Sequence, residues 1–322
     1  MFERQAEPYR RELKLHCYRM LGSLHEAEDA VQEAYLRAWR NYARFDGSGP
    51  FRAWLYRIAT NCCLDAITAR KNQRRLLPDQ EGPAAREITL PETMPAADLA
   101  WLEPFPDSLI DEIADEAPGP EARYSSQETV RLAFVAAIQQ LPPRQRAILL
   151  LCDVLGWSAN ETATLLGGTP TSVNSALQRA RDTMAKRYPR GQPTALRPDP
   201  EQQILLDRYL RAWEGHDLDG FVALLKEDAS FSMPPWPQWY KGRAAIAAFF
   251  AGAWKACGGL RMVQTAANGQ PAFAVYSRDE AGVWGAHAIH VLTLEQGMVA
   301  KFTIFIESSL FASFGLPPSL EA

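Results

Sequence analysis

The first part of the chain has the hydrophobic period of α-helices. Small and apolar residues recur at intervals of three and four, at Ala27, Ala30, Val31, Ala34, Tyr35 and Ala38. Residues 45–50 (FDGSGP) interrupt this pattern with two glycines and a proline, and we expect a second helix over residues 51–75. Residues 126–188 are again helical by pattern, with a break at Pro142-Pro143. The pattern therefore predicts two separate helical modules.

The segments between and after these modules differ in pattern. Residues 76–126 contain eight prolines and no long hydrophobic period, which predicts a linker, and residues 190–200 predict a second, shorter one. Beyond them we expect amphipathic helices over residues 201–217, 220–228 and 243–256. Alternating β-rich runs follow at 261–277, 283–296 and 298–308, with turns at Asn268-Gly269, Asp279-Glu280 and Gln296-Gly297. Helices followed by strands predict an α+β domain.

The predicted organisation is multidomain. Two all-α helical modules cover residues 1–76 and 127–189, and an acidic, proline-rich linker covers residues 77–126 between them. A short linker over 190–200 leads to an α+β domain over 201–322. A chain of 322 residues is long enough for several hydrophobic cores.

Charge is distributed in blocks that the net value of −4 conceals. Residues 1–75 carry 14 basic and 9 acidic side chains, and residues 127–190 carry 8 and 4. Residues 76–126 carry 2 basic and 12 acidic side chains, and residues 191–322 carry 10 and 13. A uniformly basic nucleic-acid binder is excluded, but the two helical modules each have the positive charge expected of one.

The second module contains the spacing of a helix-turn-helix. Ser158 and Glu161 form a predicted capping box, Gly167-Gly168 form the turn, and Thr169-Pro170 begin the next helix. With Val173, Ala176, Leu177 and Ala180 facing inward, the exposed face carries Thr171, Ser172, Asn174, Ser175, Gln178, Arg179 and Arg181. Such side chains can hydrogen-bond base edges and phosphates. The alternative is a two-helix hairpin with a solvated polar face.

The helix predicted over residues 51–75 mixes aromatic and basic side chains, as single-strand stacking platforms do. We expect Trp54 and Tyr56, two positions apart, to divide between the protein core and the surface. The five cysteines lack metal-ligand spacing and indicate reduced thiols in a cytosolic protein. No signal peptide or membrane-spanning run is present, and neither a cofactor nor a metal is expected.

Taken together, these segments resemble the sigma-70 family of RNA polymerase sigma factors, of the extracytoplasmic-function type with a C-terminal SnoaL-like (nuclear transport factor 2-like) domain. Residues 27–40 (AEDAVQEAYLRAWR) resemble the polymerase-binding helix of region 2, and residues 51–75 resemble its minus-10 segment. Residues 141–181 are similar to region 4, which recognises the minus-35 element, and residues 101–111 (WLEPFPDSLID) resemble a linker feature of the same subset.

The resemblance implies roles for particular residues. Polymerase contact, at the β′ coiled coil, would involve Asp29, Gln32, Glu33, Leu36 and Trp39. The minus-10 DNA would be met by Trp54, Asn61, Asp65, Arg70, Lys71 and Arg74. Asn61 and Asp65 would hold a flipped base, for which an amide and a carboxylate on one helix face are suited; a local hydrogen bond between them is the alternative. The acidic linker would be either a phosphate mimic inside the polymerase or a soluble spacer.

For the last domain the resemblance implies a cone-shaped fold with an internal pocket. Candidate lining residues are Met233, Trp239, Tyr240, Tyr276 and His290, with Phe231, Trp236, Phe249, Trp284 and Phe305 as further aromatic or apolar candidates. A plain hydrophobic core is the alternative, and a buried core role is favoured for His290 because it shares a strand face with alanines and leucines. Asp228 and His290 are the candidate pair for catalysis. Residues 268–276 (NGQPAFAVY) resemble a motif of such extensions and are expected in the pocket or in a contact with the two helical sigma modules.

The function that the sequence indicates is a non-enzymatic, cytoplasmic and nucleoid-associated transcription initiation factor. Its expected partners are promoter DNA and core RNA polymerase, through the β′ and β subunits. The tail domain would modulate activity by intramolecular contact with the sigma modules, with a small-molecule ligand as a further candidate partner. The alternatives are a sigma-like protein whose tail is an enzyme or sensor, and a helix-turn-helix repressor; the first basic module has no use in a repressor.

Overall fold

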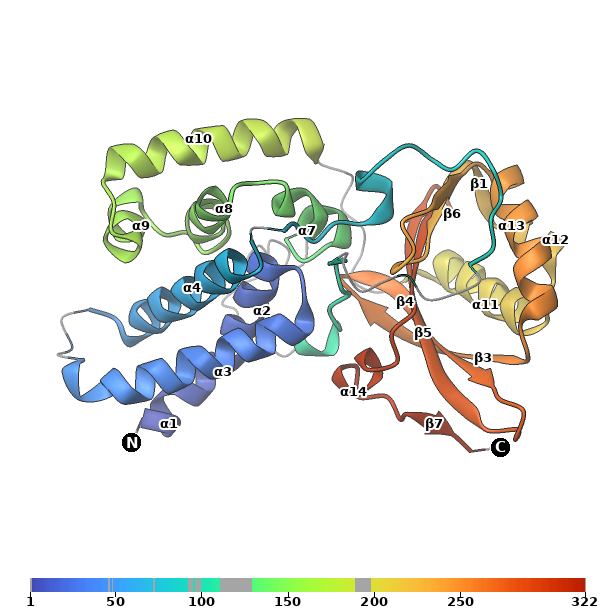
Figure 1. The fold of residues 1–322 in the computed structure, drawn as a ribbon, viewed down its shortest axis with the longest axis horizontal. Coiled ribbons are helices and arrows are strands. Elements are labelled where there is room, and N and C mark those ends of the chain that lie inside the picture. The colour runs from blue at the N-terminus through green and yellow to red at the C-terminus, as the bar shows by residue number, and fades with distance from the viewer. Residues whose placement is uncertain are drawn as a thin grey trace. The chain divides into compact units, whose positions relative to one another are not determined.

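The computed structural model describes residues 2–45, 47, 49–71, 73–91, 95, 100–110, 129–188 and 198–321. They form two compact units (Figure 1). The first unit combines Met1–Arg75 with Leu109–Gln192, and the second combines Leu76–Ser108 with Pro193–Ala322. The residues between the two helical modules are thus divided, because those up to Ser108 belong to the unit that contains the end of the chain. In the described part of the chain, no helix is both long and apolar enough to cross a bilayer.

The first unit is all helical where it is described. Its helices are α1 (Phe2–Ala6), α2 (Arg10–Leu21), α3 (Leu24–Asn41), α4 (Phe51–Ala69), α7 (Leu132–Gln139), α8 (Pro143–Leu149), α9 (Ala159–Leu166) and α10 (Pro170–Arg187), with 3-10 turns at Glu7–Tyr9 and Tyr42–Arg44 and a π turn at Leu150–Val154. The stripe predicted on α3 is buried except for the half-buried Tyr35. Ser23 caps this helix by accepting a hydrogen bond from the Glu26 amide at 3.1 Å.

Helix α4 is shorter than the sequence predicts. It ends at Ala69 rather than at residue 75, and Lys71 has a left-handed φ of 56°. Arg70 and Arg75 both turn toward the carboxylate of Glu26, at 2.5 and 2.9 Å. Two residues five positions apart lie on different sides of a helix, so a continued helix would not bring both to one carboxylate.

A buried arginine joins the two helical modules inside the first unit. Arg146 of α8 is 2% exposed and donates hydrogen bonds to the Met20 carbonyl at the end of α2 and to the side-chain oxygen of Gln139. It also donates to the carbonyls of Ile138, Gln139 and Leu141, at 3.0, 2.9 and 3.2 Å. Among the described residues no carboxylate pairs with this charge, and burial lowers the pKa of Arg146 to about 9. Its hydrogen-bond acceptors in the described part of the chain are therefore all neutral backbone and amide oxygens.

The second unit is an α+β domain, as the sequence predicts. Its elements are a 3-10 turn (Pro78–Gln80), α11 (Pro200–Glu214), α12 (Leu218–Ala223), β1 (Leu225–Ser232), β2 (Trp239–Lys241), α13 (Arg243–Ala256), β3 (Leu260–Ala267), β4 (Gln270–Arg278), β5 (Trp284–Glu295), β6 (Met298–Phe305), α14 (Leu310–Ser313) and β7 (Ser319–Leu320). The strand order is β2-β1-β6-β5-β4-β3, with β7 paired to β5, and only the β1–β6 pair is parallel among the described strands. Helices α11, α12 and α13 lie against one face of this curved sheet (Figure 1), and their aromatic side chains fill the core between.

One helix of this domain is also shorter than predicted. Residues 225–228 were expected in a helix that begins at residue 220, but α12 ends at Ala223 and Leu225 already begins β1. Leu225 is buried and pairs with Val299 of β6, and Ala229 and Phe231 are buried on the same strand. Tertiary pairing with β6 thus overrides a local helical pattern.

We predict that Arg146→Ala lowers the free energy of unfolding of the first unit by about 3–5 kcal/mol, because the substitution leaves a cavity and several buried oxygens without a donor. Urea titration followed by circular dichroism measures this change. Arg144→Ala is the matched control on the same helix, since Arg144 is exposed and donates one hydrogen bond, to Leu166 O at 2.7 Å. A similar loss for both variants would contradict the assignment of Arg146 as the joint between the modules.

Candidate nucleic-acid interface

Helices α9 and α10 form the predicted helix-turn-helix. The side chain of Ser158 accepts a hydrogen bond from the Glu161 amide at 3.2 Å, and the Glu161 carboxylate accepts one from the Ser158 amide at 2.8 Å, which completes the capping box. Gly167 ends α9 with a left-handed φ of 63°. Thr169 then caps α10 by accepting from the Ser172 amide at 3.2 Å, with Pro170 at the first helical position. Local sequence signals therefore fix the turn between the two helices.

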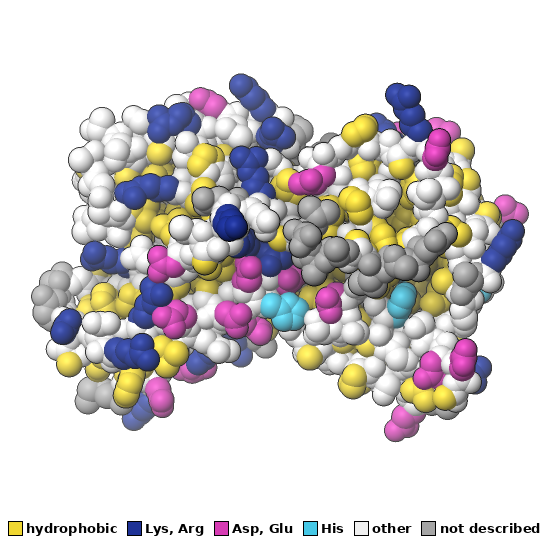
Figure 2. Space-filling view, viewed as in Figure 1, with side chains coloured by type: hydrophobic (Ala, Val, Ile, Leu, Met, Phe, Trp, Pro, Cys, Tyr) yellow, Lys and Arg dark blue, Asp and Glu magenta, His cyan; other side chains and the backbone are white. Residues whose placement is uncertain are grey.

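The exposed face of α10 carries the predicted DNA-contacting side chains. Val173, Ala176, Leu177 and Ala180 are buried, as expected. All seven candidate residues on the other face are exposed: Thr171, Ser172, Asn174, Ser175, Gln178, Arg179 and Arg181. Basic side chains lie along this helix in the space-filling view (Figure 2). Placement fits a recognition helix, while the contact of each residue with DNA stays a prediction.

Some of these side chains already have partners within the protein. Ser172 donates from its hydroxyl to the Thr169 carbonyl at 2.7 Å, and Gln178 donates to Asp182 at 2.9 Å. Arg181 is paired with Asp153 at 2.6 Å, which raises the pKa of its guanidinium. No hydrogen bond or ion pair holds the Arg179 guanidinium among the described residues. Arg179 can therefore contact DNA without first breaking an ion pair of the kind that Arg181 forms with Asp153.

The aromatic side chains of α4 divide as predicted. Tyr56 is 1% exposed, its ring contacts Trp157 at 5.5 Å between centroids, and burial raises its pKa beyond the ordinary range. Trp54 is only half-buried, with the rings of Phe45 and Phe51 at 5.0 and 5.6 Å. Trp54 is therefore the ring on this helix that could stack on a base.

An arginine that the sequence analysis did not single out connects two of the predicted sites. Asn61 and Asp65 are both exposed on α4, but Asp65 accepts from Arg37 at 2.8 Å rather than from Asn61. Arg37 also donates to Glu33 at 2.7 Å, and the two carboxylates raise its pKa. The spacing of Glu33 and Arg37, i and i+4 on a helix, was the available signal. Base capture by Asp65 would compete with this ion pair.

The basic residues after α4 differ in their availability. Arg70 was expected to meet DNA phosphates, yet its side chain is 13% exposed and paired with Glu26, and burial lowers its pKa. The structure gives Arg70 a role in joining α4 to α3, and phosphate contact would require this pair to open. Lys71 and Arg74 are exposed, with Arg74 within 3.3 Å of the Gln140 side-chain oxygen. They remain the accessible cations of this segment.

A groove runs along α3 beside the first helix. It has a volume of about 690 Å³ and is lined by Phe2, Glu3, Arg4, Glu7, Arg10, Gln32, Tyr35, Leu36 and Trp39. The Tyr35 hydroxyl donates to the Ala6 carbonyl at 2.7 Å and so holds the first helix against α3. Leu36 and Trp39 are 49% and 64% exposed, which is unusual for side chains of their size. Of the other predicted polymerase contacts, Asp29 is exposed and Glu33 half-buried.

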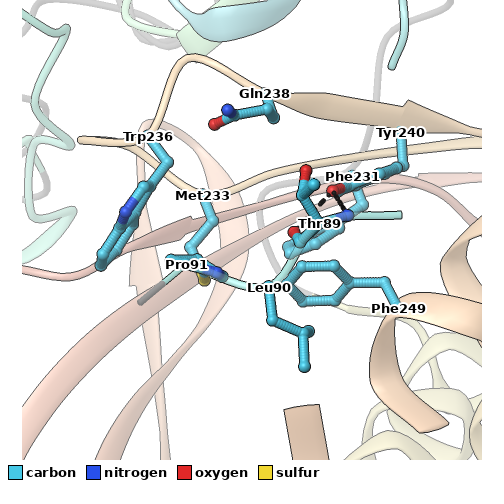
Figure 3. A pocket seen from close by; sticks show the side chains of 9 residues that line it. All are labelled: Thr89, Leu90, Pro91, Phe231, Met233, Trp236, Gln238, Tyr240 and Phe249. Carbon is cyan, nitrogen blue, oxygen red and sulfur yellow. Dashed lines mark hydrogen bonds between the residues drawn. The ribbon is translucent and has the colours of Figure 1, made fainter. Parts of the chain in front are cut away.

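The second unit contains a small cavity at the edge of its sheet. Its volume is about 50 Å³, and its lining is Thr89, Leu90, Pro91, Phe231, Met233, Trp236, Gln238, Tyr240 and Phe249 (Figure 3). Met233 and Tyr240 are thus placed as predicted, with Phe231, Trp236 and Phe249. Gln238 and the three residues before position 92 were missed, and no sequence pattern relates them to residues 140 positions away.

Five of the predicted pocket residues lie elsewhere: Trp239, Tyr276, His290, the half-buried Trp284 and the buried Phe305. Trp239 donates from its ring to the Gly82 carbonyl at 2.9 Å, and the fully buried Tyr276 donates to the Pro317 carbonyl at 3.0 Å. His290 is a core residue: the Tyr209 hydroxyl lies 3.2 Å from its Nδ1, and burial lowers its pKa to about 3. Asp228, by contrast, is 71% exposed, so it does not share a cavity with His290. No group of three or more metal-ligating side chains occurs among the described residues.

Residues 105–107, in the segment that connects the two helical modules, contact the turn between β3 and β4. Phe105 and Asn268 exchange two hydrogen bonds of 2.8 Å, from the Phe105 amide to the Asn268 side-chain oxygen and from the Asn268 amide to the Phe105 carbonyl. Asp107 accepts from the Gly269 amide at 2.8 Å. The motifs at 101–111 and 268–276 therefore contact each other within the second unit, while a contact of residues 268–276 with the sigma modules stays a prediction.

Comparison with known proteins agrees with this division. Residues 6–74 match the family described as Sigma-70 region 2, residues 131–184 match Sigma-70 region 4, and residues 206–302 match the SnoaL-like domain. These matches define a sigma-70 type protein with a SnoaL-like domain. The ECF RNA polymerase sigma factor SigG of Mycobacterium tuberculosis is 44% identical over 99% of this chain and 85% of its own length. SigW of Bacillus subtilis is 30% identical over 53% of this chain and 80% of its own.

The chain belongs to the family of ECF RNA polymerase sigma factors. Its fold also matches the crystal structure of the extracytoplasmic function sigma factor SigJ of Mycobacterium tuberculosis, with a TM-score of 0.59 and 21% identity, over 97% of this chain and 99% of that one. The predicted fold class, two helical sigma regions followed by an α+β SnoaL-like domain, is confirmed.

We predict that Arg179→Ala weakens binding of polymerase holoenzyme to minus-35 DNA by about 1–3 kcal/mol, because it removes a guanidinium that has no partner among the described residues and can contact a base or phosphate. Electrophoretic mobility shift at fixed salt measures the change. Arg208→Ala, at an exposed position of α11, removes the same charge and should leave affinity unchanged. Equal effects of the two variants would show a general charge effect instead of a contact.

Proposed function

We propose that this sigma factor binds core RNA polymerase through α3, contacts minus-10 DNA through α4 and the residues after it, and contacts minus-35 DNA through α10. As a sigma factor it acts in transcription initiation. The observation that carries the division of labour is the sidedness of α10, whose apolar stripe is buried and whose seven candidate contacts are exposed. We place its action on the nucleoid in the cytoplasm.

The groove along α3 is the proposed polymerase site. Leu36 and Trp39 provide exposed apolar surface, and charged side chains of the first two helical turns surround it, including Glu3, Arg4 and Glu7. Large apolar anchors with a polar rim are the usual arrangement of a protein interface. An α-helical partner such as the β′ coiled coil fits an open groove of this kind.

The SnoaL-like domain is proposed to act by holding the segment that connects the two sigma regions. The bonds between Phe105 and Asn268 support this role, as do those of residues 79–91 with β2 and β6. No catalysis is proposed for the domain, because Asp228 lies in solvent and His290 in the core. The acidic residues of the connecting segment are proposed to enter polymerase surfaces that otherwise hold nucleic acid; residues 111–128, which carry many of them, lie outside the described residues.

We predict that Trp39→Ala raises the Kd for core polymerase at least tenfold, about 1.4 kcal/mol, and lowers promoter-dependent transcription in vitro to match. The matched control is Ile204→Ala, which truncates an apolar side chain that is 60% exposed on α11. Fluorescence anisotropy with labelled core enzyme measures binding, and run-off transcription measures activity. The proposed function would be wrong if the wild-type protein supported no promoter-dependent initiation. If Trp39→Ala bound core polymerase as tightly as the wild type, the polymerase site would not lie at Trp39 of α3.

A further inference from the structure

The cavity of the second unit is closed by a segment from outside the SnoaL-like fold. Thr89, Leu90 and Pro91 line it together with side chains of β1, β2, α13 and the loop between the two strands. Figure 3 shows these three residues among the aromatic side chains of the cavity. We define residues 79–91 as the strap. The strap belongs to the part of the chain that connects the two sigma regions.

The strap is held mainly through its backbone. The Ala85 amide donates to the Trp239 carbonyl at 2.8 Å, along the open edge of β2. The Tyr240 hydroxyl donates to the Thr89 carbonyl at 3.0 Å and accepts from the Thr89 amide at 3.2 Å. A single tyrosine thereby satisfies both backbone groups of one strap residue. A ligand that bonds to this hydroxyl would take the place of Thr89.

The side chains of the strap are poorly buried for their type. Leu90 is 41% exposed although it lies at the cavity mouth, and Ile88 is 38% exposed. Leu90 packs against Gly252 of α13, where the absence of a side chain leaves room for it. A Cβ at position 252 would lie 3.0 Å from the Leu90 Cδ1. We call this position of the Leu90 side chain, above Gly252, its seat. Because Leu90 buries little apolar surface there, the hydrophobic effect holds it in the seat only weakly.

We propose that this cavity is a binding site for a small aromatic molecule with one hydroxyl or carbonyl group, and that the strap occupies its mouth in competition with the ligand. This proposal goes beyond the role in transcription initiation. The rings of Phe231, Phe249 and Trp236 provide the apolar walls, and Tyr240 and Gln238 are the side chains that provide hydrogen bonds at the rim. Space for the ligand comes from the existing volume together with that of Leu90.

Ligand binding then releases the strap. The ring occupies the seat of Leu90 above Gly252, the polar group bonds to the Tyr240 hydroxyl, and Thr89 loses both of its partners there. Since the site is available only while Leu90 is out, the apparent affinity of the intact chain is reduced by the fraction of time for which the seat is empty. The domain thereby couples a small molecule to the segment between the two sigma regions.

The test uses p-cresol as the probe and the full-length chain. Leu90→Ala is expected to lower the Kd for p-cresol about tenfold, because it removes the competing side chain. Ile88→Ala is the matched control, a truncation of equal size in the same strap at a residue that does not line the cavity, and its Kd should stay within about twofold of wild type. Adding Tyr240→Phe to Leu90→Ala should weaken binding about fivefold, through the lost hydrogen bond. Isothermal titration calorimetry measures all four proteins.

A second readout needs no substitution. Arg86 is exposed in the strap, so trypsin cleavage after it reports strap release. Saturating p-cresol should speed this cleavage in the wild-type protein by at least about threefold, with the site confirmed by mass spectrometry. The proposal is overturned if p-cresol binds neither the wild-type protein nor Leu90→Ala, or if Ile88→Ala gains as much affinity as Leu90→Ala. It is also overturned if bound p-cresol does not change the rate of trypsin cleavage. Polymerase takes no part in these measurements, so their failure leaves the transcription assay as a separate test.

Discussion

The reciprocal hydrogen bonds between Phe105 and Asn268 are the interaction that fixes the segment between the sigma regions to the SnoaL-like domain. Both residues are fully buried, and Asn268 has a left-handed φ of 58° in the turn between β3 and β4. Leaving either buried group without its partner would cost about 1–3 kcal/mol. With the strap fixed at β2, the segment between the sigma regions is held at both edges of the sheet, β2 at one and β3 with its turn at the other.

Two sets of contacts connect sigma region 2, sigma region 4 and the SnoaL-like domain. The sigma regions are joined within the first unit by Arg146, whose charge is solvated by neutral backbone and amide oxygens. The segment that links them is held by the SnoaL-like domain. In the proposals made above, release of that segment exchanges its hydrogen bonds with the domain for bonds with water or polymerase, and a cavity ligand favours release by occupying the Tyr240 hydroxyl. The action on transcription that we propose for the domain works through this hold on the segment and requires no catalytic step.

The sequence predicted the features that arise from local signals. The caps of α9 and α10, the turn between them and the buried stripe of α10 follow from residues close together in the chain, and the Asn268-Gly269 turn follows from its dipeptide. The predicted ends of α4 and α12 lie several residues beyond the observed ones. Ion pairs with Glu26 set the end of α4, and pairing with β6 sets the end of α12, and both partners are distant in the sequence. The cavity walls from β1 and α13 could be found by composition, but Leu90 could not, since an isolated leucine in a proline-rich segment has no period.

Hydrogen exchange on the full-length chain tests the central claim most directly. The account predicts that the amides of Ala85, Thr89, Phe105 and Asp107 are protected in the free protein, because each donates to an acceptor in the SnoaL-like domain. Their protection should fall when core polymerase is added. If these amides exchanged in the free protein as fast as those of an unstructured peptide, the SnoaL-like domain would not hold the connecting segment, and the account would be contradicted.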